Sequence, residues 1–359
     1  MQKNPQLFSI YLYIAFLSDV CYTYIRYRKR DDIMDYTISI TNKCNLRCSY
    51  CYERHLNTEY GCIDSEMRDK IAGFIKSQGN ADIVYLFGGE PLLYKDTVKF
   101  YCENITAKEF VITTNGTLLD EDFIKWCADR KVIINMSHDG KKYSDRGVDT
   151  KLLDSKLKLL LKYQPETLVQ LVYTEQTLPE LYDNVLYLKE LGVKKVSATM
   201  DAFLAADDPD SFGDILREQW RKLAEIPDLF LYELAVKKKN IKENQRSICE
   251  ICKKKLFINW DGRFYPCVQF QNIPEYRCGD VFVGIQAENA RKAHPDYSMV
   301  SERCKGCEIA RYCRNSCACR KMSTTGTVRD ISEAACMEEQ VHILTALEII
   351  SKENGGKKQ

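Results

Sequence analysis

Three cysteines lie within eight residues in the segment TNKCNLRCSYCYE, residues 41–53. Cys44, Cys48 and Cys51 follow the spacing C-x3-C-x2-C. Because cysteine makes up 17 of the 359 residues, chance would produce this spacing only about 0.04 times in such a chain. Three thiolates supply three corners of a 4Fe-4S cluster and leave one iron open, whereas structural zinc normally has four closed ligands. The spacing therefore predicts a metal site with an open coordination position.

The remaining cysteines and the charge exclude several classes of protein. Most of the other cysteines lie between Cys249 and Cys336. A secreted disulfide scaffold is usually shorter, so metal binding in a reducing, cytoplasmic setting is the better interpretation. The 52 basic and 51 acidic residues give a net charge of +1 without a strongly basic block, so we do not expect a nucleic-acid partner.

Residues 1–33 form an N-terminal extension of uncertain role. Its segment 7–25 is mainly apolar before Ser18 and Asp19, and the basic run RYRKR follows. The apolar part is too short to span a bilayer, and we therefore expect no membrane anchor. The alternatives to an anchor are a helix packed on the rest of the protein, or an upstream start codon, since Met34 stands just before the first expected strand.

Residues 34–235 alternate short β-rich runs with amphipathic stretches, which is typical of βα units around a parallel sheet. We predict a partial (β/α)6 barrel similar to a TIM barrel, within an α/β fold. The expected strands are 36–41, 84–87, 110–113, 132–137, 168–174 and 196–200. The expected helices are 65–78, 94–104, 120–130, 151–163, 179–191 and 212–224.

Unusual residues follow each of the first four expected strands. These are Cys44, the Gly88-Gly89-Glu90 run, Asn115 and Asp139. In βα barrels the reactive groups lie at the C-terminal ends of the strands. We therefore expect these four segments to meet on one face.

The C-terminal third, residues 249–345, is predicted to be a separate cysteine-rich domain. The charged stretch 236–248 is expected to be an exposed linker. A hairpin is expected to turn at WDGR (260–263), and a last helix to run from about 332 to about 352. Cysteines occur as C-x9-G-x4-C from Cys252 to Cys267 and as C-x2-C-x5-C-x3-C from Cys304 to Cys317. A pair of zinc knuckles is the alternative to iron-sulfur clusters.

The C-x3-C-x2-C motif after a first barrel strand resembles the radical S-adenosylmethionine (SAM) superfamily. The resemblance implies that the open iron chelates the amine and carboxylate of SAM. Single motifs of this kind are often only turns or helix caps, but FGGEP, TTNG and SHDG occur in the family's order after successive strands. The SAM-binding residues that the resemblance implies are Tyr50, Gly88, Gly89, Glu90, Asn115, Ser137, Asp139 and Arg146.

The later cysteines resemble the SPASM extension of this superfamily, which implies two auxiliary 4Fe-4S clusters and three clusters in all. Auxiliary cluster one would use Cys249, Cys252 or both, with Cys267 and Cys317. Auxiliary cluster two would use Cys304, Cys307, Cys313 and Cys336.

Other cysteines and one histidine match no ligand position. We expect Cys62, Cys102 and Cys127 to be small buried side chains. Cys278 and Cys319 lie near the cluster motifs and are candidate spare ligands. His138, inside SHDG, is expected to be a hydrogen-bonded structural residue.

Three functions compete on these grounds. The first is an oxidoreductase that matures a ribosomally made peptide by a thioether or carbon-carbon crosslink. The second is anaerobic sulfatase maturation. Enzymes of that class characteristically carry an aspartate directly after the YPC cysteine and tend to read QGGEP, whereas this chain has Val268 and Phe87 at these positions. The third is a non-catalytic iron-sulfur protein, which the SAM motifs disfavour. We therefore favour peptide maturation.

The expected partners follow from this function. They are a precursor peptide and a low-potential electron donor such as flavodoxin or ferredoxin. Because only 33 residues precede Met34, too few for a leader-binding domain, we also expect either a separate leader-binding protein or leader recognition by the barrel.

Overall fold

The structure is a computed structural model. It describes residues 34–57, 59–141, 146–245, 254–286, 288–289, 304–313 and 317–355. The N-terminal extension, Cys249 and Cys252 lie outside these ranges. No helix in the described ranges is long and apolar enough to cross a membrane.

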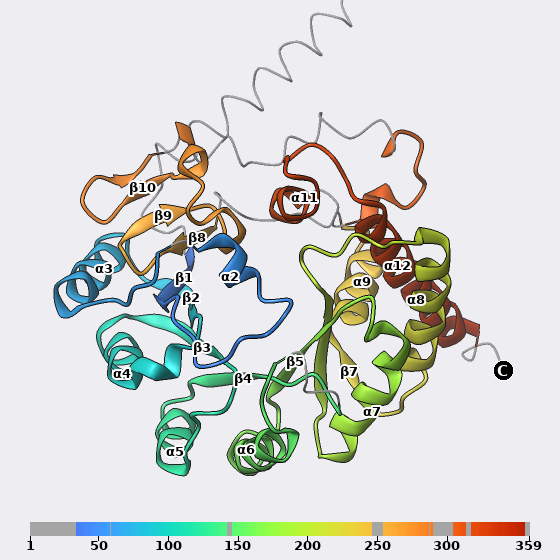
Figure 1. The fold of residues 1–359 in the computed structure, drawn as a ribbon, viewed down its shortest axis with the longest axis horizontal. Helices are drawn as coiled ribbons and strands as arrows, with labels where there is room; N and C mark the ends of the chain where they lie inside the picture. Colours follow the sequence, from blue (N-terminus) through green and yellow to red (C-terminus); the bar gives the residue numbers. More distant parts are fainter. Residues whose placement is uncertain are drawn as a thin grey trace, which may run out of the picture.

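One curved sheet forms the centre of the protein (Figure 1). Its first seven strands are parallel and are paired in sequence order, so each neighbours the next. These strands are β1 (Met34–Thr41), β2 (Ala81–Gly88), β3 (Ala107–Thr114), β4 (Ile133–Ser137), β5 (Leu168–Tyr173), β6 (Lys195–Met200) and β7 (Phe230–Leu231). The predicted α/β fold with a parallel sheet is confirmed, although the two ends of the described sheet do not pair to close a barrel.

Helices follow the strands and lie around the outside of the sheet (Figure 1). These helices are α2 (Tyr52–Leu56), α3 (Ser65–Ser77), α4 (Lys95–Asn104), α5 (Glu121–Asp129), α6 (Thr150–Tyr163), α7 (Leu181–Glu190) and α8 (Pro209–Ala224). A short 3-10 helix, η1 (Pro91–Tyr94), precedes α4. All six predicted strand-helix repeats are present, with ends that differ by up to three residues.

Local sequence explains where these elements begin and what they bury. The Asp64 side chain accepts a hydrogen bond from the Met67 amide and begins α3, and Asp120 does the same for α5. Strand β1 completely buries Ile38 and Ile40 on one face and Ser39 and Thr41 on the other. Burial of both faces of the strands against helices is typical of parallel sheets.

The C-terminal region extends the same sheet. Strand β8 (Lys255–Ile258) pairs in parallel with β1, and β9 (Arg263–Tyr265) pairs antiparallel with β8 as the predicted hairpin. Strands β10 (Gly279–Asp280) and β11 (Gly284–Ile285) continue the sheet. The 3-10 helix η3 (Val268–Phe270) lies between β9 and β10 in the chain, and helices α11 (Ala318–Thr325) and α12 (Glu333–Gly355) follow β11.

The predicted exposed linker is wrong for its first part. Residues 232–242 form helix α9 (Tyr232–Lys242), which packs against β6 and α12. Lys237 is buried there, and its Nζ lies 2.5 Å from the Glu339 carboxylate. Although this stretch is rich in charged residues, the Lys237 ammonium group is buried, and its partner Glu339 lies far along the chain.

Candidate active site

The loops after the first four strands meet at one end of the sheet, as predicted. The Gly89 amide donates to the Thr41 carbonyl at 2.7 Å, which joins the loops after β2 and β1. The Asn115 Nδ2, after β3, lies 3.8 Å from the Cys44 Sγ. Tyr50 of the first loop reaches the loop after β4. The three cysteines therefore lie in a loop that is held by its neighbours.

Two glycines permit the close approach of the first two loops. Gly88 has a φ of +148°, and a Cβ on it would lie 2.1 Å from the Thr41 carbonyl oxygen. A Cβ on Gly89 would lie 2.3 Å from the Lys43 carbonyl oxygen. Only residues without a side chain fit against this backbone.

Gly89→Ala is expected to push the cysteine loop away and to reduce the free energy of unfolding by about 1–3 kcal/mol, as overpacking does. Denaturant unfolding measures this change. Gly73→Ala is the control, because a Cβ at that helical position meets nothing within 4 Å. The control variant should be as stable as the original protein or more stable. Equal stability of the two alanine variants would contradict the close packing.

Glu90 supports these loops from inside. Its side chain is fully buried, and its carboxylate accepts hydrogen bonds from the Leu92 amide at 3.0 Å, the Asn115 amide at 2.8 Å and the Thr114 hydroxyl at 2.7 Å. Burial raises the pKa of Glu90, although these hydrogen bonds oppose that shift. Glu90 therefore joins the loops after β2 and β3, and its contact with SAM stays a prediction.

The three thiols of the first motif are in positions that a cluster could reach. Cys44 is exposed, while Cys48 and Cys51 are half-buried. Cys51 precedes helix α2, and its amide donates to the Cys48 carbonyl at 3.3 Å. Burial raises the pKa of Cys48 to about 11.

Among the described residues, no group of three or more cysteine, histidine or acidic side chains converges to hold a single metal ion. In a 4Fe-4S cluster each thiolate binds a different iron, so its ligands do not converge on one point. Three thiols from one loop, one of them exposed, are a donor set that fits such a cluster.

A buried ion pair closes the side of the site next to β4. The Arg146 Nη2 donates to the Asp139 Oδ1 at 2.8 Å, and Nε lies 2.7 Å from Oδ2. The Tyr50 hydroxyl donates to the same carboxylate. Burial alone would lower the pKa of Arg146, but the charge and hydrogen bond of Asp139 together with the nearby Tyr50 and Cys48 outweigh burial and raise it. Three residues that the resemblance assigns to SAM binding thus contact one another.

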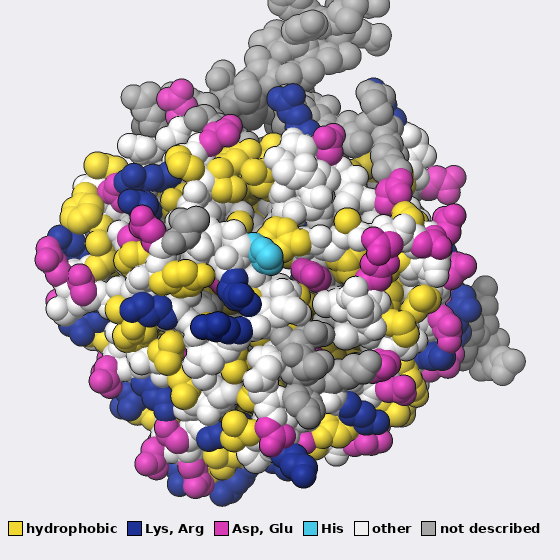
Figure 2. Space-filling model, in the orientation of Figure 1, with side chains coloured by type: hydrophobic (Ala, Val, Ile, Leu, Met, Phe, Trp, Pro, Cys, Tyr) yellow, Lys and Arg dark blue, Asp and Glu magenta, His cyan; other side chains and the backbone are white. Residues whose placement is uncertain are grey.

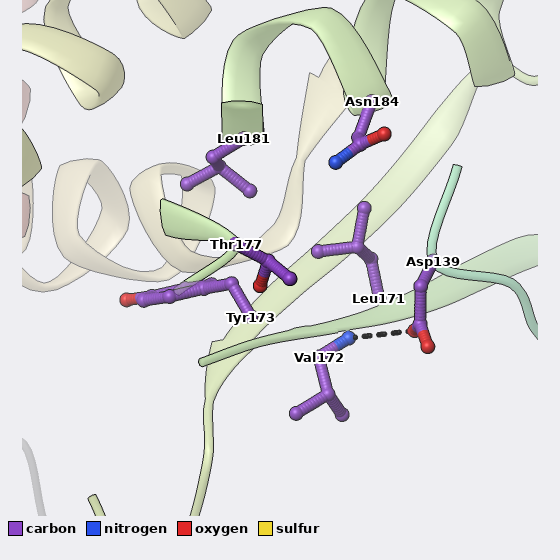
Figure 3. Close-up of a pocket in the computed structure, with 7 residues that line it drawn as sticks. All are labelled: Asp139, Leu171, Val172, Tyr173, Thr177, Leu181 and Asn184. Carbon is purple, nitrogen blue, oxygen red and sulfur yellow. Dashed lines mark hydrogen bonds between the residues drawn. The ribbon is translucent and has the colours of Figure 1, made fainter. Parts of the chain in front are cut away.

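Behind Asp139 lies a cavity of about 10 Å³, which has room for one water molecule at most. Figure 3 shows one Asp139 carboxylate oxygen on the Val172 amide, a hydrogen bond of 3.1 Å, with Leu181 and Asn184 of α7 across the cavity. This side is too small for SAM.

Two other predicted residues have mainly structural contacts. Ser137 ends β4 and pairs with Gln170 of β5. The His138 Nε2 lies 3.0 Å from an Asp154 carboxylate oxygen, and its Nδ1 accepts from the Gly140 amide at 3.1 Å. Burial lowers the pKa of His138. The prediction of a hydrogen-bonded structural histidine is confirmed.

The C-terminal cysteines include one group from distant parts of the chain. The buried Cys319 thiol hydrogen-bonds with the thiols of Cys267 and Cys317. These two belong to the predicted ligands of auxiliary cluster one. Cys278 instead packs in the main hydrophobic core, as does Cys127.

The thiols predicted for auxiliary cluster two are placed on several short segments. The Cys307 amide donates to the Cys304 carbonyl at 3.2 Å, and Cys336 lies on α12. The buried Lys321 ammonium interacts electrostatically with the thiols of Cys304 and Cys313, and also with that of Cys317. The assignment of these ligands stays a prediction.

Asn45, within the cysteine loop, also contacts the loop after β3, and sequence reasoning missed it. The Asn45 Oδ1 accepts from the Asn115 Nδ2 at 2.9 Å, and the Asn45 Nδ2 donates to the Thr117 hydroxyl at 2.8 Å. Its position directly after Cys44 was the available signal.

The surface in the view of Figure 2 carries both acidic and basic side chains, and neither kind forms a continuous field across the described part of this face. This mixture agrees with the net charge of +1.

A sequence profile of the Radical SAM superfamily matches residues 38–218. The cysteine-type anaerobic sulfatase-maturating enzyme of Clostridium perfringens is 23% identical over 318 residues, which cover 76% of this chain and 85% of that enzyme. The tungsten-containing aldehyde ferredoxin oxidoreductase cofactor-modifying protein of Pyrococcus furiosus is 27% identical over 255 residues, covering 65% and 70%.

Solved structures show the same fold. Native anSMEcpe with bound AdoMet has a TM-score of 0.73 at 19% identity, and the match covers 90% of this chain and 100% of that protein chain. SuiB of Streptococcus suis bound to its precursor peptide SuiA has a TM-score of 0.60 at 16% identity and covers 85% of this chain and 76% of its own.

Proposed function

Because this chain belongs to the radical SAM superfamily and is therefore an enzyme, we propose that it modifies a ribosomally made peptide by a thioether or carbon-carbon crosslink. The observation that carries this proposal is the residue after Cys267. Val268 begins η3 and packs against a second hydrophobic cluster that contains Phe270. A hydrocarbon side chain cannot accept a proton, so it cannot replace the aspartate of sulfatase-maturing enzymes.

Cys44, Cys48 and Cys51 are the proposed ligands of the SAM-binding 4Fe-4S cluster. When bound, the reduced cluster and SAM supply the 5'-deoxyadenosyl radical that removes a hydrogen atom from the substrate. The protein positions these groups and excludes water. Asn115 contacts Cys44 directly, and the Gly88-Gly89 backbone holds the loop that carries the thiols.

Tyr50, Asp139 and Arg146 form the proposed wall for the methionyl end of SAM. Arg146 is almost fully buried and already paired with Asp139, so its charge is fixed in place before a ligand arrives. A fixed guanidinium is suited to bind a carboxylate. Ser137, at the end of β4, and Asn115, after β3, are further proposed contacts of SAM.

The C-terminal cysteines are the proposed ligands of two auxiliary clusters. The approach of Cys267 and Cys317 around Cys319 supports a shared cluster for that pair. The cysteine-rich region proposed from the sequence as a separate domain would then be a functional unit and not a separate structural one, because β8 and β9 belong to the same sheet as the barrel strands. Reduction of the clusters requires a low-potential donor such as flavodoxin or ferredoxin.

Anaerobic sulfatase maturation is the second candidate. The 85% coverage of the Clostridium perfringens enzyme and the TM-score of 0.73 favour it. Against it, the chain has Phe87 where that class has glutamine, and the Phe87 ring stacks on Tyr52 at 6.5 Å.

Co-expression separates the two candidates. The chain would be produced with short peptides encoded beside its gene, and separately with a sulfatase peptide that contains the target cysteine. Peptide crosslinking predicts a peptide that is lighter by two hydrogens, as measured by mass spectrometry. An aldehyde in the sulfatase peptide, with unchanged neighbouring peptides, would support the second candidate instead.

A further inference from the structure

A buried polar network joins the cysteine loop to the segment that follows Cys267. Its centre is the Glu53 carboxylate, on the helix that begins directly after Cys51. The Gln271 Nε2 donates to the Glu53 Oε1 at 2.8 Å, and the Asn57 Nδ2 donates to the other oxygen at 2.8 Å. Glu53, Gln271 and Asn57 are each at most 5% exposed. Loss of one partner from a buried hydrogen bond leaves the other polar group unsatisfied, which costs the full desolvation free energy of that group.

The network continues to both sides. The Asn57 Oδ1 accepts from the Asn42 Nδ2 at 3.0 Å, and Asn42 lies between β1 and Cys44. The same oxygen accepts from the Asn272 Nδ2 at 2.7 Å. The cysteine loop is therefore tied at both its ends to one segment of the C-terminal region.

That segment is a direct continuation of Cys267. Cys267 precedes η3, and its carbonyl accepts from the Phe270 amide at 3.0 Å. Gln271 ends the same turn. One 3-10 turn therefore separates this thiol from the side chain that holds Glu53.

The backbone at Asn272 is strained in a way that serves this contact. Its φ is +61°, in the left-handed region that few residues other than glycine adopt. Such strain persists where surrounding contacts over-determine the conformation. Here the left-handed turn brings the Asn272 amide onto Asn57 and the Leu56 carbonyl.

We propose that Glu53, Gln271, Asn57 and Asn272 form a clamp that fixes the cysteine loop relative to Cys267. They are positioning residues, since they act through the backbone of the two thiol-bearing segments. The importance for catalysis of the position of the cysteine loop relative to Cys267 rests on the proposed function, in which these two segments hold different clusters. The clamp itself is a property of the chain.

Amide hydrogen exchange on the full-length protein with its clusters tests the clamp. Gln271→Ala removes one bond to the carboxylate and should speed exchange in residues 52–57 by about 10-fold or more. Asn272→Gly is a second variant in case the first does not fold, because glycine accepts the left-handed backbone while removing the amide. It should speed exchange in the same residues.

Gln219→Ala is the matched control. Gln219 is also buried, and it joins α8 to the first turn of α7 and to the segment before it. Its side chain donates to the Pro179 carbonyl at 2.9 Å and accepts from the Tyr182 amide at 2.8 Å. It should destabilise its own surroundings and leave residues 52–57 unchanged.

The exchanged pair Glu53→Gln with Gln271→Glu provides a rescue. A glutamine at 53 accepts from Asn57 and donates to a carboxylate at 271, so exchange in residues 52–57 should return toward that of the original protein. Equal exchange in the Gln271→Ala and Gln219→Ala proteins, or no rescue by the exchanged pair, would overturn the clamp. Exchange needs neither SAM nor peptide, so failure of SAM cleavage would refute the proposed function and leave the clamp standing.

Discussion

Cys48→Ala is expected to lower the rate of 5'-deoxyadenosine formation from SAM by at least about 100-fold. Loss of residues that merely support metal ligands reduces metal affinity or activity by about 10- to 100-fold, and a ligand should have at least the larger effect. Liquid chromatography of reactions with reduced, reconstituted protein measures the product.

Cys127→Ala is the matched control for this prediction. Cys127 is fully buried in the hydrophobic core on α5, away from the cysteine loop. Its loss should lower stability and leave the rate per cluster nearly unchanged. Undiminished product from the Cys48→Ala protein would show that this thiol is not a ligand.

Lys237→Met is expected to reduce the free energy of unfolding by about 3–5 kcal/mol, because it removes the ammonium group that pairs with the buried Glu339 carboxylate. The Lys237 and Glu339 side chains are 2% and 4% exposed. The Lys237 Nζ also donates to the Tyr312 carbonyl at 3.1 Å, next to Cys313. The loss should therefore also loosen the cysteine-rich segment. Urea unfolding measures the change.

Lys238→Met is the control at the neighbouring position. Lys238 pairs with Glu353 on the surface, where both side chains are partly exposed. Exposed pairs contribute about 0–1 kcal/mol, so this variant should unfold almost like the original protein. The double variant Lys237→Met with Glu339→Leu should recover part of the lost stability. Similar unfolding of the two single variants would contradict a buried ion pair.

Much of the fold could be predicted because the strand ends carry distinctive residues. Cys44, Gly89 and Asn115 each follow a strand of the parallel sheet, and their meeting follows from the geometry of such sheets. Hydrogen bonds between those loops confirm this prediction. Local spacing was sufficient here because the sheet itself brings successive strand ends together.

Contacts between distant segments could not be predicted. Glu53 and Gln271 are separated by 218 positions, and Lys237 and Glu339 by 102. A charged side chain in a polar stretch is normally exposed, so the sequence of α9 indicated a linker. Burial is decided by the partner, and no local pattern identifies the partner.

The pairing of β8 with β1 was missed for the same reason. A two-strand hairpin was predicted correctly, but the strand that it joins lies at the other end of the chain. The C-terminal region is thus continuous with the barrel sheet, and the clamp at Glu53 adds a second connection between them.

We propose that this enzyme transfers a hydrogen atom from a peptide to the 5'-deoxyadenosyl radical. A reaction of a deuterium-labelled peptide encoded beside the gene with SAM, a reductant and the reconstituted protein tests this transfer. Mass spectrometry should find deuterium in 5'-deoxyadenosine and a peptide that is lighter by two hydrogen isotopes. Formation of 5'-deoxyadenosine without deuterium, with every such peptide unchanged, would contradict hydrogen transfer from a peptide.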